Sequence, residues 1–249
     1  MVLYIKRTIL MVLGLILTFG LGYWTGKFSV DDLPVNGLLA RKMPIFYVKK
    51  KTPDVCLTFD ISWGEKTLPL VLKVLENQQT PATFFLSGPW AVKHPEAVKE
   101  IYNQGHEIAS HGDRHLDLSQ YPKETVRENI SKAHRDLLSV VDRVAPYFRP
   151  PNGDYDDLVI DTAKELGFET VIWSVDSLDW KNPGPEYMID RVLQRVFPGA
   201  IVLCHASDSS REIHLALPGI ISGLRKKGFR LVTLSQLAEG GSFARNDPR

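Results

Sequence analysis

The chain has 249 residues, of which 44% are hydrophobic and 24% are charged, which excludes a largely disordered protein. Its 30 Lys and Arg residues balance 29 Asp and Glu residues, so it lacks the basic excess that phosphate contacts need, and we expect no nucleic-acid partner. The two cysteines exclude a disulfide scaffold and a cysteine-rich zinc module.

An uncharged, apolar stretch lies near the start of the chain, between Arg7 and Lys27. Its 19 residues would rise roughly 28 Å as a helix, about the hydrocarbon thickness of a bilayer. Tyr23 and Trp24 stand at its far end, where amphipathic rings suit a membrane interface. We therefore predict a single-pass anchor at residues 1–27 that holds the rest of the chain outside the cytoplasm at the cell membrane. A cleaved signal peptide is the alternative.

Three segments follow the predicted anchor. Residues 28–53 carry Pro, Gly and mixed charge, and we expect a stalk with a short antiparallel entry strand at 44–48. Residues 54–238 are expected to form the main domain, and residues 239–249 a loose tail.

Short apolar runs rich in β-branched residues alternate with amphipathic runs in the main domain. We predict strands at residues 55–59, 82–86, 107–110, 147–149, 170–175, 200–204 and 230–233. We predict helices at residues 67–77, 91–103, 123–141, 157–166, 186–196 and 213–226. This alternation predicts an α/β fold with a parallel sheet, either open or closed into a barrel.

Polar side chains follow five of the predicted strands at their carboxyl ends. They are Asp60, His111, His115, Arg149, Asp176, Asp179 and His205. The carboxyl ends of parallel strands lie on one face of a sheet, where barrel and open-sheet enzymes place their active sites. The sequence therefore predicts one polar site at this face.

Each of these residues also has a structural interpretation. His111 and His115 could chelate one ion through neutral imidazoles, or could be two surface histidines. Asp60 could be a catalytic base or a helix cap, and Arg149 could depress the pKa of a carboxylate or form a surface ion pair. His205 could be a general acid if an aspartate raises its pKa, or a structural histidine at a strand end with its hydrogen bonds made within the protein.

Five segments together resemble the ordered motifs of the polysaccharide deacetylases, carbohydrate esterase family 4 or the NodB homology domain. They are TFDISWG (58–64), HGDRH (111–115), RPPNGDY (149–155), DSLDW (176–180) and LCH (203–205). The resemblance covers about residues 54–238. The first motif and the predicted anchor look most like the sporulation-type peptidoglycan deacetylases of bacteria.

The resemblance implies a distorted (β/α)7 barrel, which would follow the predicted N-terminal transmembrane helix. It implies a hydrolase that removes N-acetyl groups from amino sugars of peptidoglycan or a related cell-wall glycan, with release of acetate. By matching positions, Asp60 is the base, Arg149 tunes the base, His205 is the acid and Asp179 orients the acid.

The same match assigns His111 and His115 to a divalent metal, which we expect to be zinc. Trp180 matches an aromatic wall of the sugar groove, and Trp63 and Tyr155 are further candidates for stacking on sugar rings. The sequence does not predict the oligomeric state.

One position departs from the family pattern, because Ile61 stands where the metal-binding aspartate is expected. Isoleucine cannot bind a metal, so two protein ligands remain where catalytic zinc usually has three. Glu65 or Asp60 could complete the site, with Asp113, between the histidines, ranked last, or waters could complete a weaker one. The third alternative is a catalytically weak or inactive glycan-binding barrel. A metal-dependent hydrolase that acts on another amide also stays open.

The two cysteines and one tryptophan are assigned to structural positions. Strand alternation puts Cys56 and Cys204 on opposite faces of the barrel wall, so we predict two free, buried thiols. Trp173 lies in the middle of a predicted strand and is expected to pack in the core.

Overall fold

The structure is a computed structural model that describes residues 41–249, and Lys42–Arg249 form one compact unit. The anchor predicted at residues 1–27 and the first part of the stalk therefore lie outside the described residues. Within residues 41–249, no helix has the length and apolar character needed to span a bilayer.

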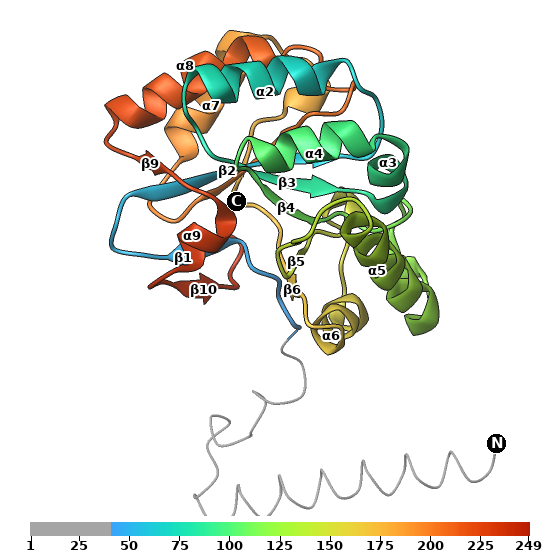
Figure 1. The fold of residues 1–249 in the computed structure, drawn as a ribbon. Helices are drawn as coiled ribbons and strands as arrows, with labels where there is room; N and C mark the ends of the chain where they lie inside the picture. Colours follow the sequence, from blue (N-terminus) through green and yellow to red (C-terminus); the bar gives the residue numbers. More distant parts are fainter. Residues whose placement is uncertain (1–40) are drawn as a thin grey trace, which may run out of the picture. The chain divides into compact units, whose positions relative to one another are not determined.

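A curled parallel sheet forms the centre of the domain (Figure 1). Its strands are β2 (Asp54–Ile61), β3 (Thr83–Leu86), β4 (Glu107–Ser110), β5 (Tyr147–Phe148), β6 (Glu169–Thr170), β7 (Val175–Asp176), β8 (Ile201–His205) and β9 (Arg230–Leu231). Their order in space is β6-β5-β4-β3-β2-β8-β7, and β9 pairs with the first residues of β2. All eight residues of β2 are buried, as expected for the central strand of a parallel sheet.

One segment connects the two edges of this sheet. The chain pairs with β5 through β6 and, a few residues later, pairs with β8 through β7. Between them, the Val171 N–H donates to Phe148 O at 2.9 Å and the Ser174 N–H donates to Ile201 O at 3.0 Å. The single strand predicted at 170–175 is thus divided, because its two halves have different partners. The curled parallel sheet is a half-barrel that is consistent with the distorted (β/α)7 barrel.

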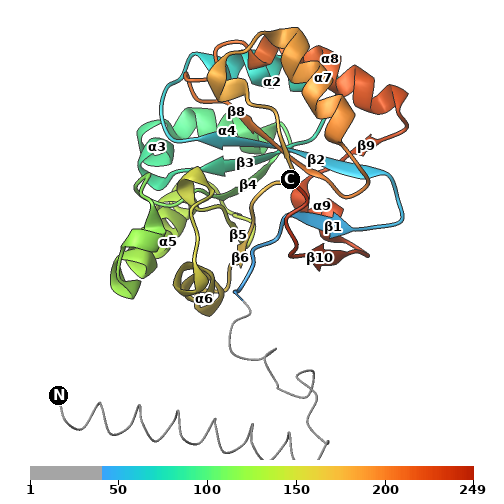
Figure 2. The same cartoon turned by 180° about the vertical axis from the view of Figure 1, so that it is seen from behind.

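Helices cover the outside of the curled sheet. They are α2 (Thr67–Asn77), α3 (Gly88–Lys93), α4 (Pro95–Asn103), α5 (Lys123–Leu138), α6 (Asp157–Glu165), α7 (Pro185–Arg195), α8 (Ile213–Lys226) and α9 (Leu234–Ala238). Figures 1 and 2 show α2, α7 and α8 gathered along one side of β2, with α6 on the other side of the domain. The helix predicted at 91–103 is two helices, since His94 leaves the helical conformation before Pro95.

The alternation of β2 separates two hydrophobic clusters. Leu57, Phe59 and Ile61 belong to an outer cluster with residues of α2, α7 and α8. Cys56 belongs to an inner cluster inside the curled sheet, whereas Cys204 of β8 belongs to the outer one. Both cysteines are free and buried, which confirms the prediction.

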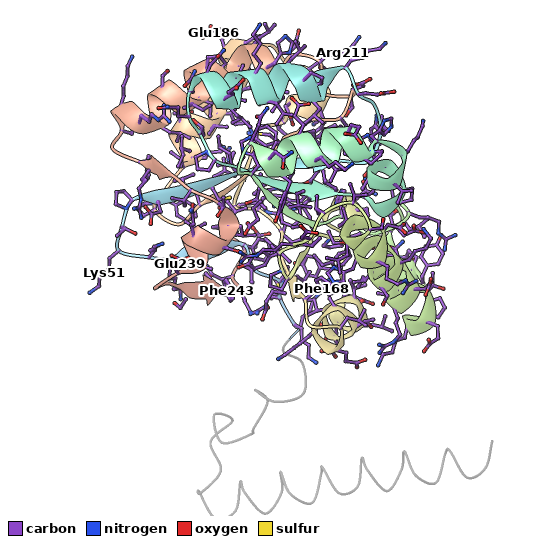
Figure 3. The ribbon with its side chains drawn as sticks, viewed as in Figure 1. Lys51, Phe168, Glu186, Arg211, Glu239 and Phe243 are labelled. Carbon is purple, nitrogen blue, oxygen red and sulfur yellow. The ribbon has the colours of Figure 1, made fainter. Side chains whose placement is uncertain are left out.

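The end of the chain forms a second, small sheet with the entry strand. β1 (Tyr47–Lys49) pairs antiparallel with β10 (Ser242–Ala244). The expectation of a loose tail is therefore wrong for this stretch, because β10 pairs with the edge of β1. In Figure 3, Lys51, Glu239 and Phe243 mark the side of the domain where this small sheet lies.

Candidate active site

The register between the two central strands places Asp60 directly beside His205. β2 and β8 are parallel neighbours, and Asp60 and His205 are partners in their ladder at the carboxyl ends. Side chains alternate along a strand, so Thr58 and Asp60 share the inner face while Ile61 faces outward. Two of the sequence-predicted side chains thus meet through pairing between distant segments.

Arg149 holds Asp60 from inside the barrel. Its Nη1 donates to Asp60 Oδ1 at 2.7 Å and to Thr58 Oγ1 at 2.9 Å, and its Nη2 donates to Ile172 O at 3.0 Å. Arg149 is fully buried, and its guanidinium lies 4.0 Å from the centre of the Phe85 ring. Burial is the largest influence and raises the pKa of Asp60, but the charge and hydrogen bond of Arg149, together with the neighbouring His111 and His205, lower that pKa overall. Asp60 is therefore a carboxylate at neutral pH.

Asp179 holds His205 in a second buried pair. The His205 Nδ1–H donates to Asp179 Oδ1 at 2.8 Å, and the backbone N–H of His205 donates to Asp179 Oδ2 at 2.6 Å. Ser210 Oγ also donates to Asp179 Oδ2, at 2.7 Å. Burial is the largest influence and lowers the pKa of His205, but the charge and hydrogen bond of Asp179, together with the charges of Asp60 and Asp176, raise it overall. His205 is thus favoured in its protonated form.

His111 and His115 face each other beside Asp60, with ring centres 5.6 Å apart. They lie outside any helix, so their four-residue spacing does not place them on a helical turn. His111 Nδ1 lies 2.8 Å from Arg149 O, and a carbonyl only accepts, so Nδ1 carries the proton and Nε2 has the free lone pair. Burial lowers the pKa of His111 to about 4, so the ring is neutral at pH 7.

These side chains open into one cleft with a volume of about 490 Å³. Its lining includes Asp60, Trp63, His111, His115, Asn152, Gly153, Trp173, Asp176, Trp180 and His205. Trp63 and Trp180 are 49% and 47% exposed, so each offers a ring face to a ligand. Arg149 and Asp179 are fully buried and act on the cleft through their partners.

Some cleft residues differ from the sequence-based expectation. Tyr155 is not among the residues that line the cleft; it packs against the hydrophobic cluster of α5 and α6. Trp173 packs against the inner hydrophobic cluster, as expected, but it also lines the cleft, 5.7 Å from the Arg149 guanidinium. Asn152 also lines the cleft, in a left-handed conformation with φ 57°. Asn152 is not among the residues predicted from the sequence, although its place inside the RPPNGDY motif could have indicated a role in the site.

The residues present do not fit a three-ligand metal site. Ile61 is fully buried in the outer hydrophobic cluster. The Glu65 side chain is 71% exposed and lies 3.4 Å from His94, and Asp113 pairs with Lys132 at 2.6 Å. Throughout residues 41–249, no three His, Cys, Asp or Glu side chains gather in a group that could hold a metal ion. The expected zinc site therefore lacks its third protein ligand.

Comparison with known families identifies the fold. The family model described as polysaccharide deacetylase matches residues 47–171, which is half of the chain. The chain belongs to the polysaccharide deacetylase family. The sequence motifs that resembled this family supply the residues on both sides of the cleft.

Individual relatives include both an enzyme and a pseudoenzyme. A peptidoglycan-N-acetylglucosamine deacetylase of Bacillus cereus is 35% identical over 80% of this chain and 97% of its own length. The uncharacterised YlxY of Bacillus subtilis is 32% identical over 86% of this chain and 68% of its own length. The crystal structure of a CE4-family pseudoenzyme from Bacillus anthracis has a TM-score of 0.73 and 29% identity, covering 78% of this chain and 68% of that one.

Proposed function

We propose that this chain is an N-deacetylase that releases acetate from an N-acetylated amino sugar of a cell-wall glycan. The observation that carries the proposal is the pairing of Asp60 with His205 at one cleft, with their pKa values moved in opposite directions. A carboxylate and a protonated imidazole side by side are the base and the acid that amide hydrolysis needs.

The two pairs divide the proton transfers between them. Asp60 removes a proton from the water that attacks the acetamide carbonyl carbon. His205 then protonates the sugar nitrogen as the carbon–nitrogen bond breaks, which leaves acetate and a free amine. Arg149 keeps Asp60 ionised, and Asp179 keeps His205 protonated and oriented. The half-exposed rings of Trp63 and Trp180 supply faces on which sugar rings can stack.

The test is acetate release from purified peptidoglycan by the full chain. Asp60→Asn and His205→Ala are each expected to lower the rate by at least about 100-fold, the range that general acid or base catalysis contributes. Asp113→Asn is the matched control, because Asp113 pairs with Lys132 away from the cleft and should keep wild-type activity. Circular dichroism checks that each variant is folded. Near-wild-type release by either cleft variant would contradict the roles assigned here.

A non-catalytic glycan-binding barrel is the second candidate, and Ile61 is the observation that favours it. The same cleft and its two exposed tryptophans would then bind a glycan without cleaving it. Glycan binding by calorimetry with no acetate release would favour this candidate. Release of acetate that depends on Asp60 and His205 would exclude it.

The proposal also includes the location of the protein. We propose that residues 1–27 anchor it in the cell membrane by a single span, with the cleft domain outside the cytoplasm. Digestion of the domain by a protease added to cells stripped of their wall would support this location. Protection from the protease until the membrane is lysed would contradict it.

A further inference from the structure

Most of the carboxylate oxygens near the two histidines already have other partners or point away from them. Asp60 Oδ1 accepts from Arg149 at 2.7 Å, and Asp113 pairs with Lys132 at 2.6 Å. The Glu65 side chain points to solvent beside His94. Of these oxygens, Asp60 Oδ2 alone faces His111 outside the Arg149 ion pair, and within residues 41–249 it does not form a three-ligand metal group with the two histidines. Two imidazoles without a third ligand lack the usual ligand number of resident catalytic zinc.

Asp60 and His111 still present two hydrogen-bond acceptors to the cleft. The bond from His111 Nδ1–H to Arg149 O leaves the Nε2 lone pair free, and this nitrogen lies 3.8 Å from Asp60 Oδ2. Neither atom can donate in these protonation states, so they do not satisfy each other. One water can lie about 2.8 Å from both atoms and donate one proton to each.

We propose that the cleft works without a resident divalent ion, and that Asp60 Oδ2 and His111 Nε2 hold the attacking water between them. This inference rests on the proposed deacetylation. The water gives one proton to Asp60 as its oxygen bonds to the acetamide carbon, while His111 accepts the other hydrogen bond and keeps the oxygen in line. Arg149 orients both acceptor groups, because its side chain donates to Asp60 and its backbone carbonyl accepts from His111.

The first experiment measures metal directly. The full chain is dialysed against a chelator and then against metal-free buffer, and its metal content and its affinity for Zn²⁺ are measured by mass spectrometry and calorimetry. We expect less than a tenth of an equivalent of metal and an unchanged rate of acetate release. A stoichiometric ion that survives dialysis and is lost in His111→Ala would overturn the proposal. Release that stops with chelator and returns with zinc would do the same.

The second experiment asks what His111 supplies. His111→Ala is expected to lower kcat by at least tenfold with little change in KM, because the water loses one of its two holders. His111→Asn keeps an acceptor oxygen, is a poor zinc ligand, and is expected to recover part of kcat. His106→Ala is the matched control, since His106 is also a buried neutral histidine and lies outside the cleft. Equal kcat in His111→Ala and wild type would overturn the water-holding role.

The two experiments separate failure of this inference from failure of the proposed function. If the wild-type chain releases no acetate, the deacetylation and the water-holding role both fall. Metal content and zinc affinity need no activity, so they decide the metal-free cleft in either case.

Discussion

The pairing of His205 with Asp179 predicts a pH dependence. Asp179→Asn keeps an oxygen that can accept from Nδ1 but removes the negative charge that raises the pKa of His205. That pKa should therefore fall, because an opposite charge at hydrogen-bond distance is lost. His205 must be protonated to act as the acid, so the alkaline limb of the pH–kcat/KM profile should move to lower pH by about one pH unit or more. An alkaline limb that stays in place would show that His205 is not the titrating acid.

The site residues differ in how far the sequence could predict them. Asp60 and His205 could be placed together because both end buried strands of a parallel sheet, a pattern visible in the residues themselves. Tyr155 could not be placed, because the turn before it contains Asn152 at φ 57° and Gly153 at φ 66°. Such backbone conformations redirect the chain in ways that residue spacing does not show.

Local signals predicted the helices better than the strand pairings. The helices at 67–77 and 213–226 have the predicted bounds because their apolar periodicity is complete within the segment. The division of 170–175 between β5 and β8 depends on partners elsewhere in the chain, and the sequence of the segment contains no signal for it.

The turn before β8 gives a test of how closely this strand packs on β1. Gly199 has φ +87°, and a Cβ there would lie 1.7 Å from Val48 O. Gly167 has a nearly equal φ of +85°, but a Cβ added there would meet no atom within 4 Å, so it is the matched control. Gly167→Ala should lower the free energy of unfolding by about 1 kcal/mol through backbone strain alone.

Gly199→Ala must add the clash with the Val48 carbonyl to the same strain, so β8 or β1 has to move. We expect it to cost several times as much as Gly167→Ala, on the order of 3 kcal/mol or more. Urea unfolding of both variants checks the difference. Equal costs would show that β1 does not pack against Gly199 in solution.

The fold brings both ends of the described chain together. Tyr47 Oη donates to Asn246 Oδ1 at 3.1 Å, although the two residues are 199 positions apart. Arg245 pairs with Glu169 at 2.6 Å, next to the segment that closes the barrel. The sequence of 239–249 is polar and contains glycines, so its composition predicted a loose tail. Its order depends on contacts with β1 and with the barrel seam.

Arg249 provides the last test of this closure, because its guanidinium lies 5.2 Å from the centre of the Phe46 ring and 5.4 Å from that of Trp173. Trp173 lines the cleft and also faces Arg149, so Arg249 supports the wall from the other end of the chain. Arg249→Ala should lower the free energy of unfolding by about 1 kcal/mol, the value of one to two partly exposed cation–π contacts. Arg249→Lys should lose less, since an ammonium can keep part of the attraction.

The exposed Arg211 near α7 and α8 is the control, and Arg211→Ala should change stability by less than about 0.5 kcal/mol. If urea unfolding gives the same small change for Arg249→Ala, the tail does not brace Trp173, and the cleft wall stands on the barrel alone.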